Sequence, residues 1–480
     1  MAQDITGASR TGNSVASGAR LDRLPISRFH WKMLGLIGAG MFLDAFDIYL
    51  AGGVLGALVK SGWSTLELNA LFVSATFVGM TIGAWSAGVL GDRYGRRFTY
   101  QANLALFGLA SLAAAFAPNM SVLIALRFIM GIGLGAEIVV GYATLTEFVP
   151  ARSRGRWIAL LAIITNTALF ASSLVGLWVI PAFGWQYMFG IVGVLAMVIW
   201  ALRKSMPESP RWLEAQGRLD EAEAILGRIE AETAVGRSLP RLDLGGPAAP
   251  GASSAGHGSI LDLFSPGLLR QTLLGSLLHV VVGFSLYGFI NWLPTFFVKS
   301  GYSVVASLQY TTLMALGGPA GAFIGWLLAD SAGRKPTIVG SSLAAIGFGI
   351  AYPLVGDGPA LLAVGFGLVT AIYVMLTAGF AMHVPELFPT KYRLRGTAVC
   401  ATAGRLVTAV VQFVVIAVFA WGGLPGVLAI LIGLLLFQAV MIALYGIETR
   451  QQALEDIAAP ERRQPGPAPV AGRAAKGAAS

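Results

Sequence analysis

Cysteine and charged side chains are scarce in this sequence. Cys400 is the only cysteine among 480 residues, which excludes an intrachain disulfide and leaves this residue as a small helix-packing side chain. Charged residues make up 12% of the chain, about half of the fraction that is typical of a soluble protein. A soluble globular fold is therefore excluded.

Several stretches lack the apolar residues of a membrane span or a packed core. Residues 1–28 have no apolar core, so we expect no cleavable signal peptide. Residues 235–258, rich in Gly, Ala, Pro and Ser, and the tail after Pro460 are expected to be disordered. Just before the first of these, residues 211–233 carry Ala, Leu, Glu and Arg at helical spacing, which predicts a short cytoplasmic helical segment.

Apolar residues are abundant and come in long runs. They make up 56% of the chain, in runs of about 20 residues, the length that crosses ~30 Å of hydrocarbon as a helix. Backbone polar groups cannot remain unpaired in lipid, so these runs are predicted to be helices. Twelve runs are found, at 31–58, 67–90, 98–116, 121–145, 156–179, 183–202, 270–297, 304–330, 336–354, 359–385, 395–418 and 423–445.

Basic residues are confined to alternate loops. All but four of the 33 Lys and Arg residues lie in the termini or in the loops that begin at Arg93, Arg152, Arg203, Arg334 and Lys391. Since positive residues stay on the cytoplasmic side, both termini are predicted to be cytoplasmic in a bacterial inner membrane. The net charge of +9 is thus a topology signal, and we expect no nucleic-acid partner.

An internal repeat relates the two halves of the chain. Three motif pairs recur at nearly one offset, 238 to 240 residues: D-x-x-G-R-[RK] at Asp92 and Asp330, E-x-x-P-x-x-x-R at Glu147 and Glu386, and Glu-[Ser/Thr] at Glu208 and Glu448. This is the parallel repeat of a transporter whose halves rock about a central site.

These observations predict an all-α integral membrane protein of twelve transmembrane helices in two parallel-related six-helix halves. The expected parts are an N-terminal cytoplasmic tail (1–30), an N-terminal half (31–202), a cytoplasmic linker with short helices and a disordered stretch (203–269), a C-terminal half (270–446) and a disordered cytoplasmic tail (447–480).

The duplicated motifs place carboxylates beside guanidinium groups on the cytoplasmic surface. Such pairs can close that side in one state and separate in another. The alternative is that the loop arginines only fix topology and bind lipid head groups, but the matched duplication favours a gate. The candidate gate residues are Asp92, Arg93, Arg96, Arg97, Glu147, Arg154, Glu208, Asp330, Arg334, Lys335, Glu386 and Arg393.

The same motifs identify a family resemblance. Residues 88–97, G-V-L-G-D-R-Y-G-R-R, and residues 127–135, R-F-I-M-G-I-G-L-G, resemble signatures of the major facilitator superfamily. Residues 207–213, P-E-S-P-R-W-L, and 385–389, P-E-L-F-P, resemble its sugar-porter-like branch. The resemblance covers nearly all of 30–450. It implies the twelve-helix fold and secondary active transport, commonly by proton symport in bacteria, with the proton gradient as energy source and no cofactor or metal.

Ionisable residues inside the apolar runs are candidates for function because they are costly in lipid. Asp47 lies about 24 Å along the first helix and Arg127 roughly 9 Å into the fourth, which enters from the opposite side, so both lie at similar depth. The resemblance implies that such an Asp takes up the proton. Physically, a desolvated carboxylate binds a proton when its arginine moves away; a static structural ion pair is the alternative.

Other buried polar residues have open assignments. Asp44, one turn before Asp47, is a second proton site or a polar lining group. Glu137 makes an interhelical hydrogen bond or takes part in coupling. Histidines within apolar runs, such as His279 and His383, more often make helix-packing contacts than carry protons.

Arg405 is the candidate for reading the substrate's charge. It lies near the middle of the eleventh run with no obvious acidic partner, and a guanidinium binds a carboxylate in bidentate fashion. Pairing with backbone carbonyls or with another acid is the alternative. The seventh run carries the candidate ring contacts Phe284, Tyr287, Asn291 and Trp292, and Pro294 that can loosen it. These aromatics could equally face lipid or pack in the core.

The polar seventh-helix motif of true sugar porters is absent. The W-L-P-T at 292–295 and the D-A-F-D at 44–47 instead resemble aromatic-acid and nicotinate permeases. We therefore expect a proton-coupled symporter of a small aromatic carboxylic acid that works by alternating access, as a monomer in the bilayer. The alternatives are a sugar or polyol symporter, a drug efflux transporter and a ligand sensor. An enzyme is disfavoured, because both aspartates of the first helix share one helix and no nucleophile motif is present.

Overall fold

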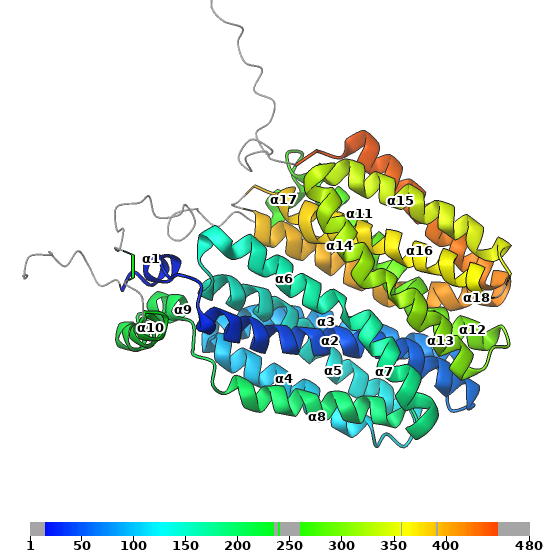
Figure 1. Ribbon diagram of the computed structural model, residues 1–480, viewed down its shortest axis with the longest axis horizontal. Coiled ribbons are helices and arrows are strands. Elements are labelled where there is room, and N and C mark those ends of the chain that lie inside the picture. Colours follow the sequence, from blue (N-terminus) through cyan, green and yellow to red (C-terminus); the bar gives the residue numbers. More distant parts are fainter. Residues whose placement is uncertain (1–14, 235–238, 241–259, 357, 390–391, 450–480) are drawn as a thin grey trace, which may run out of the picture.

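The computed structural model describes residues 15–234, 239–240, 260–356, 358–389 and 392–449, and these ranges contain helices and no strand. Long helices run side by side as one bundle, with the N-terminal half (blue to green) along one side and the C-terminal half (green to orange) along the other (Figure 1). The stretches expected to be disordered, 235–258 and the tail after Pro460, lie outside these ranges apart from residues 239 and 240.

The N-terminal half consists of six spans. They are α2 (Arg28–Lys60), α3 (Leu66–Tyr94), α4 (Arg96–Ala114), α5 (Met120–Phe148), α6 (Arg154–Asn166) continued by α7 (Ala168–Phe183), and α8 (Gln186–Arg203). Two begin at side-chain caps: Thr65 Oγ1 accepts from the Leu68 N–H at 3.3 Å, and Asn119 Oδ1 from the Val122 N–H at 3.0 Å.

The C-terminal half repeats this order with more interruptions. Its spans are α11 (Leu269–Gly283) with η3 (Phe284–Phe289), η4 (Ile290–Trp292) and α12 (Leu293–Lys299); α13 (Val304–Ala315) with α14 (Gly317–Ser331); α15 (Arg334–Ala351); α16 (Pro359–Met375) with η6 (Leu376–His383) and α17 (Val384–Glu386); and α18 (Arg393–Tyr445).

The number of spans agrees with the apolar runs. Within the described ranges, ten helical segments are long and apolar enough to cross a membrane. One of them, α18, holds two spans, because Gly423 has φ 59° and ψ −157° and breaks the helix just before Pro425. The 19-residue α4 completes the twelve.

Two spans of the C-terminal half contain π-helical turns, η3 and η6. Pro294 sits at the start of α12, after a 3₁₀ turn, so the seventh span is interrupted ahead of the proline. Such turns are rare inside α-helices and occur frequently at functional sites. The sequence analysis did not predict them.

A glycine allows a very close helix contact in the N-terminal half. A Cβ on Gly135 of α5 would lie 2.0 Å from the Met80 carbonyl oxygen of α3, so no larger residue fits without moving the backbone. Helix association in lipid depends on such small residues. Gly131 and Gly135, which follow Arg127 in the chain, therefore allow α5 to lie close against α3.

Three short helices lie at one end of the bundle: α1 (Ser17–Asp22), α9 (Pro210–Ala215) and α10 (Leu219–Thr233) (Figure 1). Helices α9 and α10 confirm the helical segment expected at 211–233. Arg20 and Arg23 of the N-terminal segment pair with Glu230 of α10 at 2.8 and 2.6 Å. The hydrogen bond from Arg20 holds the pKa of Glu230 below its usual value. The N-terminal segment is thereby tied to the linker helices.

Candidate functional site

Asp47 and Arg127 form the buried ion pair that the sequence predicted. Arg127 Nη1 lies 2.5 Å from Asp47 Oδ2, and its Nη2 donates to the Asp47 carbonyl at 2.8 Å. Its Nε donates to Thr76 Oγ1 at 3.1 Å, and the guanidinium lies 4.9 Å from the Phe72 ring centre. Both charged side chains are at most 1% exposed. Three elements, α2, α3 and α5, thus hold one pair in a fixed geometry.

A second buried pair joins Glu137 of α5 to Arg203 at the end of α8. Arg203 Nη1 lies 2.5 Å from Glu137 Oε1. Its Nε and Nη2 donate to the Leu36 and Ile37 carbonyls of α2 at 2.9 and 3.1 Å, and its guanidinium lies 4.7 Å from the Tyr100 ring centre.

Sequence reasoning placed Arg203 at the start of a cytoplasmic loop, and this was wrong for its side chain, which is 1% exposed. The long side chain turns back into the bundle from the last residue of the span. Gly40 could have signalled this: a Cβ there would lie 2.0 Å from Arg203 Nη2 and 2.6 Å from Glu137 Oε1.

Asp44 is a third buried carboxylate of α2. It is 2% exposed, and its Oδ2 has no hydrogen-bond partner among the described residues. It lies within electrostatic reach of Glu137, Arg203 and Asp47. The two aspartates of the first helix are therefore not equivalent, because only Asp47 is paired with an arginine.

Arg405 of α18 is a half-buried cation. In the part of the chain that the structure describes, it makes neither an ion pair nor a hydrogen bond. It lies within electrostatic reach of Tyr287 and His279. His279 Nδ1 contacts the Gly275 carbonyl at 2.9 Å, and its ring lies 4.5 Å from that of Phe380, contacts typical of a helix-packing histidine.

Tyr287 belongs to an aromatic cluster that joins the two halves. Its ring lies 6.3 Å from that of Tyr49 in a stacked arrangement and 4.6 Å from Phe77, both in the N-terminal half. Tyr373 Oη donates to Tyr49 Oη at 2.9 Å. Sequence reasoning missed Tyr49, Phe77 and Tyr373, because nothing in their local sequence shows that they meet across the interface.

The other predicted ring-contact residues lie in packed surroundings. Phe284 and Trp292 are at most 2% exposed within the core of the C-terminal half. Trp292 Nε1 donates to Gln412 Oε1 at 2.7 Å. Asn291 lies against Gly52 of α2, where a Cβ would be 2.7 Å from the Asn291 carbonyl oxygen and 3.0 Å from Oδ1. The seventh span is thus closely packed against the first.

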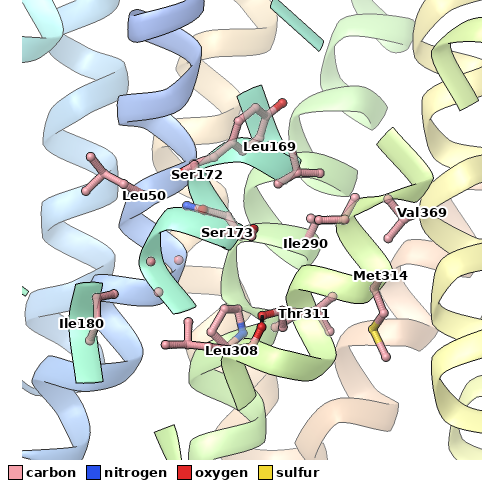
Figure 2. A pocket seen from close by; sticks show the side chains of 18 of the residues that line it. Leu50, Leu169, Ser172, Ser173, Ile180, Ile290, Leu308, Thr311, Met314 and Val369 are labelled. Atoms are coloured by element: carbon pink, nitrogen blue, oxygen red, sulfur yellow. Dashed lines mark hydrogen bonds between the residues drawn. The ribbon is translucent and has the colours of Figure 1, made fainter. Parts of the chain in front are cut away.

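A small cavity lies between the halves. Figure 2 shows Leu169, Ser172 and Ser173 of α7 on one side and Leu308, Thr311 and Met314 of α13 on the other, and Tyr49 and Asn291 also line it. Its volume of about 30 Å³ is room for about two water molecules at ~10–15 Å³ each. A ring-sized solute does not fit there without separation of the halves.

The first duplicated motif forms a charged cluster next to α9. Arg96 Nε lies 3.0 Å from Glu147 Oε1, and Arg96 Nη1 lies 3.0 Å from Asp92 Oδ1. Glu208 accepts from the Arg96 and Arg97 backbone N–H groups at 2.9 and 3.2 Å. Burial raises the pKa of Glu208, against the effect of these hydrogen bonds.

The second motif forms the same cluster in the C-terminal half. Arg334 Nε and Nη2 each lie 3.1 Å from Glu386, and Glu448 accepts from the Arg334 and Lys335 backbone N–H groups at 3.0 Å. These named pairs each join segments of one half. The repeat predicted from the motif spacing is therefore visible as matched geometry.

The remaining gate candidates lie around these clusters. Arg93 lies 5.3 Å from the Tyr94 ring centre, and Arg154 lies 3.7 Å from Asp22, which also pairs with Arg211 at 2.9 Å. Arg393 begins α18. The side chain of Asp330 lies outside the described residues.

Two six-helix halves of matched topology, with a buried ion pair in one half and a cavity between them, define a polytopic membrane transporter of the major facilitator fold. The profile of the family described as "Sugar (and other) transporter" matches residues 37–459, and the chain belongs to this family. It is accordingly a transporter and not an enzyme.

Three similar proteins illustrate the relationship. The chain is 37% identical to the inner membrane metabolite transport protein YdjE of Escherichia coli (strain K12), over 92% of this chain and 98% of that protein. It is 32% identical to the niacin transporter NiaP of Acinetobacter baylyi (strain ATCC 33305 / BD413 / ADP1), over 92% and 99%. The crystal structure of a D-xylose-proton symporter has the same fold, with a TM-score of 0.69 at 18% identity over 88% of this chain and 99% of that one.

Proposed function

We propose that the protein is a proton-coupled symporter of a small aromatic carboxylic acid, working by alternating access. It acts as a monomer in a bacterial inner membrane, with both termini cytoplasmic, and needs only the proton gradient. One observation carries the substrate class: Arg405 is a half-buried cation without an acidic partner among the described residues, within electrostatic reach of the aromatic residue Tyr287.

The chemistry of Arg405 suits a carboxylate. A guanidinium in low dielectric is stabilised by a bidentate anion, and aromatic side chains offer flat contacts to a ring. Tyr287, Tyr49 and Phe77 supply such contacts close by, from both halves. Niacin, which the similar Acinetobacter protein is named for transporting, is a small aromatic carboxylic acid.

The Asp47–Arg127 pair is the proposed coupling element. While the pair is closed, the carboxylate is held ionised by the guanidinium. When rocking of the halves moves Arg127 away, the desolvated carboxylate binds a proton. Transport of substrate and proton in one cycle follows because both sites respond to the same motion.

The test of the substrate class compares an aromatic acid with its uncharged amide. Binding of both to purified wild type, Arg405→Ala and Arg405→Lys is measured by calorimetry, with the exposed Arg228→Ala of α10 as control. Charge-assisted hydrogen bonds contribute ~1.5–3 kcal/mol, so wild type should prefer the acid about tenfold or more, and Arg405→Ala should lose this preference. Arg405→Lys should also weaken acid binding, because lysine lacks the planar fork. Equal loss of acid and amide binding would show that Arg405 is structural.

A sugar or polyol symporter is the second candidate. The amides of Asn291 and Gln412 are hydroxyl-binding groups in the seventh and eleventh spans, and the D-xylose symporter has the same fold. Gln412 is already bonded to Trp292 and to the Thr408 carbonyl. Binding of a neutral polyol that Arg405→Ala leaves unchanged would favour this candidate.

A further inference from the structure

The fully buried charges of the described chain do not balance. Five carboxylate or guanidinium side chains are at most 2% exposed, and all lie in the N-terminal half: Asp44, Asp47, Arg127, Glu137 and Arg203. Three are acids and two are bases. If all were ionised, one negative charge would remain uncompensated inside the bundle, which is strongly unfavourable. The set becomes neutral when it binds one proton.

The contacts of the five residues show where that proton belongs. Asp47 Oδ2 is paired with Arg127, which also donates to the Asp47 carbonyl, although Asp47 Oδ1 has no hydrogen-bond partner among the described residues. Arg203 donates from its Nε and Nη2 to α2 carbonyls, and its Nη1 lies 2.5 Å from Glu137 Oε1. Asp44 receives neither guanidinium as a hydrogen-bond donor, and its Oδ2 is without a partner among the described residues. The surplus acid is therefore on the Asp44–Glu137 side.

The face of α2 brings the two acids together. Ile37, Gly40, Asp44 and Asp47 follow one another at spacings of three and four residues, so they lie on one side of the helix. The Glu137–Arg203 pair packs against Gly40, where a Cβ would collide with both side chains. Asp44 lies one turn further on, about 6 Å along the axis.

We propose that Asp44 and Glu137 hold one proton between them beside Arg203, as a second proton site distinct from Asp47–Arg127. The groups that face it are Asp47 on α2, Arg203 from α8 and Tyr100 from α4, with Arg127 beyond Asp47. On transfer, the O–H bond to one carboxyl oxygen breaks as the O–H bond to the next forms, so only a proton moves.

The site lies between Asp47 and the end of the bundle that carries α1 and α10. In the proposed orientation that end is cytoplasmic, so a proton that leaves Asp47 can reach Asp44 and Glu137 without entering the cavity between the halves. The use of the site in transport rests on the proposed function. Its existence rests on the five buried charges alone.

The test is infrared spectroscopy of the purified full-length protein at neutral pH, without substrate. Wild type should show the carbonyl stretch of a protonated, buried carboxylic acid. Asp44→Asn and Glu137→Gln should each abolish that band, because either change leaves two acids facing two arginines. Glu67→Gln, at an exposed acid of α3, is the matched control and should keep the band.

A double variant distinguishes loss of the proton site from general destabilisation of the fold. Glu137→Gln combined with Arg203→Gln removes one acid and one base, which restores the surplus acid, so the band should return on Asp44. Size-exclusion profiles identify variants that fail to fold; if one single variant fails, the other and the double variant still decide. Absence of the band in wild type, or its persistence in both Asp44→Asn and Glu137→Gln, would overturn the proposal.

The outcome is separable from that of the proposed function. The infrared band needs neither substrate nor a gradient. If the band behaves as expected but a pH gradient drives no uptake, the proton site stands and proton coupling fails. If the gradient drives uptake but the band is absent, coupling stands and this site fails.

Discussion

The two halves share a topology but differ in how they treat charge and helix geometry. In the N-terminal half, the first and fourth spans, α2 and α5, are uninterrupted helices of 33 and 29 residues, and they carry four of the five buried charges. Their repeat partners in the C-terminal half are broken by π-turns and carry no fully buried carboxylate or guanidinium among the described residues.

This difference indicates a division of labour between repeats. Buried ion pairs need rigid placement, because a small displacement leaves an uncompensated charge in low dielectric. Regular helices packed through Gly135 and Gly40 provide such placement. Interrupted helices move more easily, which suits the half that carries Arg405 and Tyr287, the proposed substrate contacts. We therefore expect changes in the N-terminal half to affect coupling and changes in the C-terminal half to affect recognition.

The largest effect in the N-terminal half is expected for Asp47→Asn. The variant should abolish accumulation driven by a pH gradient in proteoliposomes, because an amide cannot exchange the proton, while counterflow of substrate continues. Glu67→Gln is the control. Gradient-driven accumulation at the wild-type level in Asp47→Asn would remove the coupling role from this pair.

The next largest effect is expected for Gly40→Ala. The new methyl group would lie 2.0 Å from Arg203 Nη2 and displace the second buried pair. Breaking a buried ion pair costs about 3 kcal/mol or more, so the midpoint of thermal unfolding, followed by size exclusion, should fall by several degrees.

Gly35→Ala on the same helix is the matched control. No atom lies within 4 Å of a Cβ there, so this variant should be neutral or slightly stabilising. Similar midpoints for the two variants would mean that the Arg203 side chain relaxes easily and that the N-terminal half does not hold this ion pair rigidly.

Smaller effects are expected at the duplicated clusters. Glu386 receives two bonds from Arg334, whereas Glu147 receives one from Arg96, so Glu386→Gln should disturb its cluster more than Glu147→Gln. Asp92→Asn should disturb it least, because the Asp92 side chain is 81% exposed and such pairs contribute ~0–1 kcal/mol.

These three variants can be ranked by labelling of an introduced cysteine on the cytoplasmic side of the cavity, in a Cys400→Ser background. The labelling rate should rise in the order Asp92, Glu147, Glu386. Equal labelling rates in all three variants and in the parent would show that the motifs set the membrane topology and do not close the cytoplasmic side.

The sequence was sufficient to predict the twelve spans, the repeat and the Asp47–Arg127 pair. Span length and depth follow from hydropathy and from the rise of a helix, so they can be read without coordinates. The role of that pair stays a prediction, as do the roles of the gate and substrate residues.

The second buried pair and the π-turns were beyond reach for different reasons. Arg203 follows the last apolar residue of its span and precedes Lys204, so local sequence reads as a loop; its direction is set by carbonyls of α2, far away in the chain. Residues 284–289 and 376–383 have the same apolar composition as regular helix, and the extra residue in each turn is fixed by packing.

The π-turn at Phe284–Phe289 shifts the helical register of the seventh span beyond it. A π-turn holds one residue more than an α-turn, so converting it to regular helix would rotate everything beyond it by about 100°. Such a rotation would break the bond from Trp292 to Gln412 and withdraw Asn291 from Gly52, two contacts that attach this span to its neighbours. Such a conversion would rotate the part of the seventh span beyond the turn about the helix axis, and it would need no bend at Pro294.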